Sequence, residues 1–176
     1  QLYQGWSLAH DASLNKTTEG LKLVKSSWES LPHAALTATG AIGVSILVET
    51  SMLANESRNV LPILERSVSA AKESTNCFWL AHLLKLCGDL YHLQSLAPNQ
   101  IEAYYQEALA TARSQGAKAL ELRSAVSLCR LWQHQGRNTE AYRLLEPLYS
   151  WFTEGFDTLD MIEAKQLIDE FTRTQA

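Results

Sequence analysis

The sequence of 176 residues contains little proline, glycine or cysteine, with 4 Pro, 8 Gly and 3 Cys. This composition, together with 46% hydrophobic residues, excludes a collagen-like chain and a largely disordered one. Cys77, Cys87 and Cys129 are odd in number and form no CxxC motif, so neither a disulfide framework nor a zinc site is indicated. A reducing compartment fits this pattern, and we expect a cytoplasmic protein.

The sequence also lacks an excess of positive charge and a long hydrophobic run. It has 15 Lys and Arg against 19 Asp and Glu, a formal net charge of −4, so direct nucleic-acid binding is not expected. The longest apolar run, residues 34–48, is shorter than the roughly 20 residues that cross a bilayer, so no membrane association is expected. Because the sequence starts at Gln1 and immediately reads like the middle of a helical array, we expect a fragment of a longer chain.

Motifs for catalysis and for cofactors are missing as well. There is no GxSxG nucleophile elbow and no HExxH, and Gly40-Ala41-Ile42-Gly43 lacks the third glycine of a dinucleotide fingerprint. His82, Asp89 and His92 share one helix face and could present ligands to a metal, but solvated positions in a groove are the better interpretation. We therefore expect no enzyme in this chain, no cofactor and no metal site.

What the sequence does contain is an internal repeat. Four apolar segments start at Gly20, Val60, Ile101 and Ala141, at spacings of 40 or 41 residues, and each has the periodicity of a helix. A partner helix with its own apolar stripe precedes each segment, and turn formers lie between the two. Each repeat is thus predicted to be a pair of antiparallel helices.

The pattern predicts an all-α fold, a right-handed α-α superhelix of about four tetratricopeptide-like helix pairs with a C-terminal capping helix. One domain is expected over residues 1–176, with repeats at 1–33, 34–75, 76–116 and 117–154 and the capping helix at 159–173. Gly88 and Cys129 are small residues at positions where paired helices approach closely. In the capping helix, Ile162, Leu167, Ile168 and Phe171 are predicted to form the buried side.

Turn and cap residues recur with the same period. Gly136 suits the left-handed conformation that ends a first helix. The predicted N-caps of the second helices are Thr18, Ser57, Asn99 and Asn138, because their side chains can accept a hydrogen bond from the first turn.

The pattern Leu128-Cys129-x-x-Trp132-x-x-x-Gly136-x-x-x-x-Ala141 resembles the tetratricopeptide signature. Residues 116–123, 131–136 and 151–158 are similar to the C-terminal region of bacterial multidomain regulators. In those proteins such repeats follow a class III adenylate or guanylate cyclase domain, or a transcriptional-regulator output domain, and a STAND-type predicted ATPase. The resemblance covers residues 78–171 and implies a part in signal transduction. No cyclase or Walker motif occurs in the 176 residues, so the activities of such a parent are not assigned to this chain.

Stacked helix pairs curl so that their first helices line a concave face. Arg123 and Arg130, seven residues apart, share a helix face and could together hold an acidic peptide or carboxylate, although ordinary solvated charge is the alternative. By repeat position, the partner-binding residues expected on the concave face are Glu49, Lys85, Asp89, His92, Arg123, Arg130, Gln133 and His134.

These observations favour a non-catalytic protein-protein interaction or regulatory scaffold of a cytosolic signalling protein. Its partner would be a protein or peptide segment, or another domain of the same chain. The alternative is a small-ligand-sensing repeat domain of a STAND-type transcription activator. The N-terminal end is expected to expose an apolar face that pairs in a homodimer.

Overall fold

The computed structural model describes residues 2–10, 14–30, 38–74, 78–95 and 98–175, and regular structure in these ranges is helical throughout, which confirms the all-α prediction. Cys77 lies outside the described residues. Among the helices in these ranges, none is both long and apolar enough to cross a membrane. The elements are α1 (Leu2–Ala9), α2 (Leu14–Glu29), α3 (Ala38–Leu53), a 3-10 turn η1 (Ser57–Asn59), α4 (Leu61–Glu73), α5 (Leu80–Leu93), α6 (Pro98–Ser114), α7 (Lys118–His134), α8 (Asn138–Ser150) and α9 (Leu159–Gln175).

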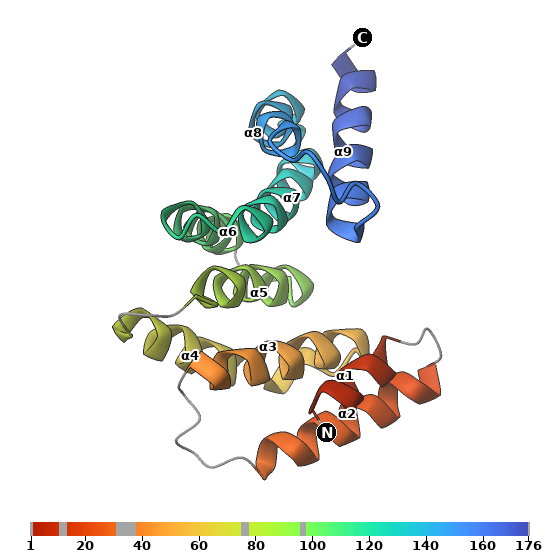
Figure 1. The fold of residues 1–176 in the computed structure, drawn as a ribbon, viewed down its shortest axis with the longest axis vertical. Coiled ribbons are helices and arrows are strands. Elements are labelled where there is room, and N and C mark those ends of the chain that lie inside the picture. Colours follow the sequence, from red (N-terminus) through yellow and green to blue (C-terminus); the bar gives the residue numbers. More distant parts are fainter. Residues whose placement is uncertain (1, 11–13, 31–37, 75–77, 96–97, 176) are drawn as a thin grey trace.

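Consecutive helices pack as pairs, and the pairs stack into a superhelix, as the repeat predicts (Figure 1). The first helices, α1, α3, α5, α7 and α9, contact one another in that order. The array bends so that α9 and α1 lie toward the same side, with α5 and α6 at the middle of the arc (Figure 1). Side chains on the inner surfaces of helices far apart in sequence therefore face a common space.

The last helix closes one end of the array through an apolar face. Met161, Ala164, Leu167 and Phe171 are buried against α7 and α8, and Phe171 is fully inaccessible. Ile162 was predicted to join them, but its side chain is exposed. Positions 161, 164, 167 and 171 follow one another at spacings of three or four residues, so they share one face of α9. Position 162 falls on the opposite face.

Small residues sit at the closest helix contacts, as predicted. A Cβ atom added to Gly88 of α5 would lie 2.4 Å from Cε1 of Tyr105 on α6. Cys129 of α7 is buried, and its Sγ lies 3.3 Å from the carbonyl oxygen of Ala141 on α8. Larger side chains at either position would force the paired helices apart.

The structure confirms the helix ends that were predicted at glycines but not the predicted N-caps. Gly136 has φ +76° after α7, as predicted, and Gly116 after α6 has φ +66°. The predicted N-caps are wrong. The helices α4 and α8 are capped by Val60 and Arg137 without a side-chain hydrogen bond, so neither Ser57 nor Asn138 is the cap, and Thr18 and Asn99 lie inside α2 and α6. Pro62 lies in the first turn of α4 and Pro98 is the first described residue of α6, positions at which the missing N–H of proline is tolerated.

Candidate functional site

The inner side of the superhelix contains a groove made of three adjoining hollows. The central hollow, about 390 Å³, is lined by residues of α1, α3, α5, α7 and α9. A hollow of about 350 Å³ shares Trp6, Glu49, His82 and Arg123 with it, and one of about 300 Å³ shares Met52, Asp89 and Ser127. We call these three hollows together the groove.

The structure brings most of the predicted concave-face residues to this groove. Gln133 is the exception, because it does not line the hollows and its Nε2 donates to Oε2 of Glu170 on α9 at 2.8 Å. The predicted residues that line the groove are Glu49, Lys85, Asp89, His92, Arg123, Arg130 and His134.

The groove also contains residues that repeat position did not single out. Trp6 comes from α1 and His10 directly follows that helix, and Asp160 and Glu163 come from α9. The family resemblance begins only at residue 78, and the final helix is expected from its sequence to bury one side as a cap. The inward-facing residues of both terminal helices were therefore missed.

One carboxylate joins three of the first helices. Glu49 of α3 accepts a hydrogen bond from Nε1 of Trp6 on α1 at 3.0 Å, and its other oxygen lies 3.0 Å from Nε2 of the buried His82 on α5. Burial by itself would raise the pKa of Glu49, but the bond and the charge of His82, the bond from Trp6 and the charge of Lys85 outweigh burial and hold the pKa below its usual range. Glu49 is therefore ionised at neutral pH.

A second carboxylate couples the groove to the outer layer of helices. Asp89 of α5 accepts from Nζ of Lys85 at 2.7 Å and from the hydroxyl of Tyr105 on α6 at 2.9 Å. Burial and the neighbouring Asp89 raise the pKa of Tyr105 far above its usual value, so this hydroxyl remains a donor. Both oxygens of Asp89 are thus occupied by internal partners.

The two arginines predicted to hold an external carboxylate already contact internal ones. Nε of Arg123 donates to Oδ2 of Asp160 at 2.6 Å, and the guanidinium of Arg130 pairs with Glu163. Both arginine side chains are about half exposed, so these ion pairs lie at the wall of the groove in contact with solvent. Asp160 and Glu163 of α9 therefore bind the two arginines that were expected to bind an acidic peptide.

Histidines are concentrated along the groove. His10, His82, His92 and His134 all line it, and the rings of His92 and His134 lie nearly parallel with centroids 6.4 Å apart. The part of the chain that the structure describes holds no group of three or more His, Cys, Asp or Glu that suits a metal ion. His82 instead contacts Glu49 and the edge of the Trp79 ring.

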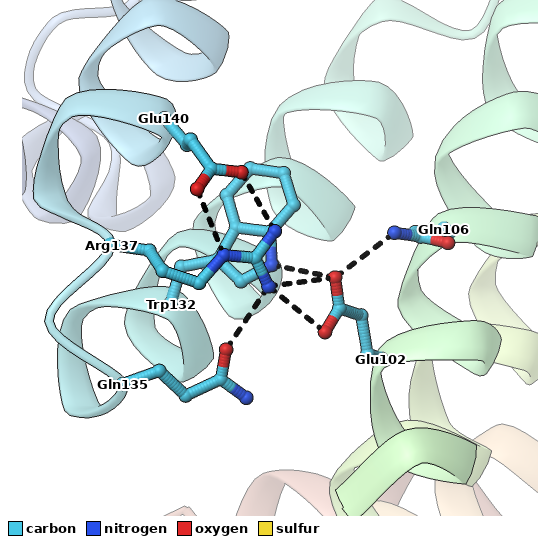
Figure 2. A network of polar contacts seen from close by, with 6 residues as sticks. All are labelled: Glu102, Gln106, Trp132, Gln135, Arg137 and Glu140. Atoms are coloured by element: carbon cyan, nitrogen blue, oxygen red, sulfur yellow. Dashed lines mark hydrogen bonds and ion pairs between the residues drawn. The ribbon is translucent and has the colours of Figure 1, made fainter.

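A separate polar network joins the third and fourth helix pairs away from the groove. Figure 2 shows the Arg137 guanidinium over the Trp132 ring, 4.6 Å from its centroid, between the carboxylates of Glu102 and Glu140. Nε1 of Trp132 also donates to Glu102 at 2.8 Å. These contacts connect α6 to the turn between α7 and α8, so the network supports the relative position of the repeats.

Comparison with known proteins identifies the architecture. No family model matches the chain, and no curated protein matches it. Among solved structures, the chain is similar to a Podosopora anserina protein described as a kinesin light chain with nearly identical TPR-like repeats, with a TM-score of 0.70 and 14% identity over 99% of this chain and 86% of that one. A single-residue variant of that protein gives a TM-score of 0.72 at the same identity and coverage. The fold is therefore that of a TPR-like repeat protein.

Proposed function

We propose that this chain is a non-catalytic interaction scaffold whose groove binds a segment of another protein, or of another domain of its own chain. The observation that carries this proposal is the groove itself, to which five successive first helices contribute side chains. Such a surface is preformed by the stacking of the repeats, so the scaffold loses little conformational entropy when a partner binds. TPR-like repeats in the similar structures support the same role.

The lining of the groove has the mixture of side chains that interfaces use. Leu53 and Leu93 are about half exposed there, next to the charged pairs Lys85–Asp89 and Arg123–Asp160. Apolar side chains exposed among polar ones are typical of a surface that a partner covers. An extended peptide or an amphipathic helix would both gain apolar contacts at these leucines.

The experiment compares groove variants with a variant elsewhere. We expect Leu53→Glu and Leu93→Glu to weaken binding of partners captured by crosslinking and then purified. Leu159→Glu, which changes an exposed leucine of α9 that does not line the groove, should leave binding unchanged. Equal binding by all three variants would contradict the groove as the binding surface.

Residues 116–123, 131–136 and 151–158 resemble the C-terminal region of bacterial multidomain regulators, and this supports a proposal about the parent protein. We place the scaffold in a bacterial cytoplasmic signalling regulator, where it would follow a class III nucleotide cyclase or other output domain and a STAND-type ATPase. The coding sequence upstream of Gln1 tests this directly. A coding sequence that encodes neither an ATPase nor an output domain there would remove the proposal.

The alternative function is sensing of a small ligand. The hollows of the groove, about 300 to 390 Å³, reach the size range of small-molecule sites. A ligand that binds the folded chain must raise its melting temperature by mass action, so thermal shift against a metabolite library tests this function.

We also propose that the chain pairs in a homodimer through its N-terminal end. Sedimentation of the purified chain tests this proposal.

A further inference from the structure

The residues that line the hollow between α1, α3 and α5 indicate which kind of side chain the groove binds in its partner. This hollow has a volume of about 350 Å³, and we call it the anchor pocket. It is lined by two tryptophans, two isoleucines, a carboxylate residue and three further polar residues: Trp6, Trp79, Ile42, Ile46, Glu49, Ser45, His82 and Arg123. Resting on the proposed function, we infer that this pocket holds a lysine or arginine side chain of the bound protein segment.

The first argument is that Glu49 is, among the described residues, the groove carboxylate that is paired with a histidine and not with a lysine or an arginine. Among the described residues, Asp89 pairs with Lys85, Asp160 with Arg123 and Glu163 with Arg130. Glu49 is bonded instead to an indole N–H and an imidazole nitrogen, and no described lysine or arginine forms an ion pair with it.

Glu49 also has room for a further donor. Each carboxylate oxygen offers two lone-pair sites, and each oxygen of Glu49 accepts one bond from the residues that the structure describes. Its side chain remains 30% exposed although it lies at the junction of three helices. An ammonium or guanidinium group entering the pocket can therefore bond to Glu49 without displacing Trp6 or His82.

Charge around the pocket points to the same partner. Four carboxylates line the central hollow with Lys85, Arg123 and the histidines His10 and His82. With Arg130 counted as the partner of Glu163 and the histidines neutral, one negative charge remains in excess. Arg123 reaches the anchor pocket as well, but its guanidinium is bonded to Asp160. An acidic side chain would meet Glu49 as a like charge, so the structure favours a cationic segment over the acidic peptide suggested by the sequence.

The walls of the pocket suit the rest of a basic side chain. The methylene stem of lysine or arginine can pack on apolar surface while its charged head meets Glu49. Tryptophan is the aromatic residue that attracts a cation most strongly, and two tryptophans line the pocket. An aliphatic anchor such as methionine would fill the pocket but leave the carboxylate without a cation.

The test uses the 176 residues of the sequence as one chain and a library of short random peptides. Bound peptides should be enriched in lysine or arginine at one position, and replacing that residue by methionine in a selected peptide should weaken binding roughly ten- to a hundredfold. Glu49→Gln, which keeps the shape and removes the charge, should abolish this difference between the two peptides. Asp169→Asn, which removes one charge from an exposed position of α9, should preserve it.

The outcomes separate this inference from the proposed function. Peptides that bind the groove without basic enrichment, or with a preference for Asp and Glu, overturn the anchor pocket alone, whereas an absence of any bound peptide contradicts segment binding itself. If n-butylammonium alone binds as tightly as the lysine peptide, the occupant is a small amine and the inference is wrong. The comparison of lysine and methionine peptides needs only the wild-type chain, so it stays decisive if Glu49→Gln fails to fold, which thermal melting by circular dichroism will show.

Discussion

Gly88 and Tyr105 are in such close contact that no side chain fits between their helices: a methyl group on Gly88 would lie 2.4 Å from Cε1 and 2.6 Å from Cδ1 of the tyrosine ring. The ring is buried, and its hydroxyl is held by Asp89, so it has little freedom to move aside. We expect Gly88→Ala to lower the free energy of unfolding by about 1 to 3 kcal/mol, as overpacking does, although alanine favours a helix. Urea unfolding followed by circular dichroism measures it.

The control for this prediction removes the ring. In a Tyr105→Leu background, Gly88→Ala should cost much less, or should stabilise the chain through its helix propensity. If the alanine has the same effect in both backgrounds, the contact with Tyr105 does not limit the approach of α5 and α6.

The attachment of α9 provides a second prediction, because apolar burial and ion pairs can be separated there. Phe171→Ala should lower the free energy of unfolding by about 3 to 5 kcal/mol, since it empties a fully buried site. Arg123→Ala and Arg130→Ala should each change it by less than about 1 kcal/mol, because their ion pairs with α9 are half exposed. Unfolding in urea ranks the three variants, and a larger loss for either arginine would show that charge rather than packing holds the helix.

Glu121 predicts a specific pH dependence. Its buried carboxylate accepts from Nε of Arg113 and Nζ of Lys118, both at 2.7 Å. Burial raises its pKa, but the bonds to Lys118 and Arg113 outweigh burial and hold the pKa below the ordinary 4.5. A carboxyl with a depressed pKa contributes stability that is complete above about pH 4.5 and is lost as the pH falls through the folded-state pKa.

Glu121→Gln should therefore destabilise the chain at pH 7 by about 1 to 2 kcal/mol, and the difference from wild type should shrink below pH 4. Melting temperatures measured across this pH range give the result. Glu107→Gln is the matched control, because its ion pair with Lys72 is exposed and should have little effect at any pH. A constant difference between Glu121→Gln and wild type at every pH would contradict this assignment.

The network around Arg137 predicts that arginine is required for its shape as well as its charge. The guanidinium lies over Trp132 and contacts Glu102 and Glu140 through different nitrogens, which a lysine ammonium cannot reproduce (Figure 2). Arg137→Lys should lower the melting temperature, and Arg137→Ala should lower it further. If the lysine variant melts with wild type, charge alone accounts for the network.

The thiols of Cys87 and Cys129 should be unreactive in the folded chain. Burial raises the pKa of each to about 12, so almost no thiolate is present at pH 8. In a Cys77→Ser variant, Ellman's reagent should label neither cysteine until denaturant is added. Rapid labelling of the native variant would show that the α5–α6 or the α7–α8 contact opens.

Much of the fold could be predicted because its signals are local. Each helix pair is specified by apolar stripes within about 40 residues, and Gly136 marks its helix end because glycine adopts a positive φ without steric cost. The close contact at Gly88 also followed from the residue type. The N-caps could not be predicted in this way, because Ser57 lies in the 3-10 turn before α4 and Asn138 is already the first residue of α8, so neither side chain is at the cap position.

The sequence by itself determined the repeat, the all-α fold and most of the residues that face the concave side, since all three depend on periodicity. Only the tertiary structure decided how those residues are paired. The bonds from Trp6 to Glu49 and from Arg123 to Asp160 join residues 43 and 37 positions apart, and no local pattern specifies which charges meet when the superhelix curves. That curvature brings α9 to the arginines and leaves Glu49 paired with His82 and with no lysine or arginine among the described residues. On this ground we expect a basic segment in the groove, where the sequence suggested an acidic one.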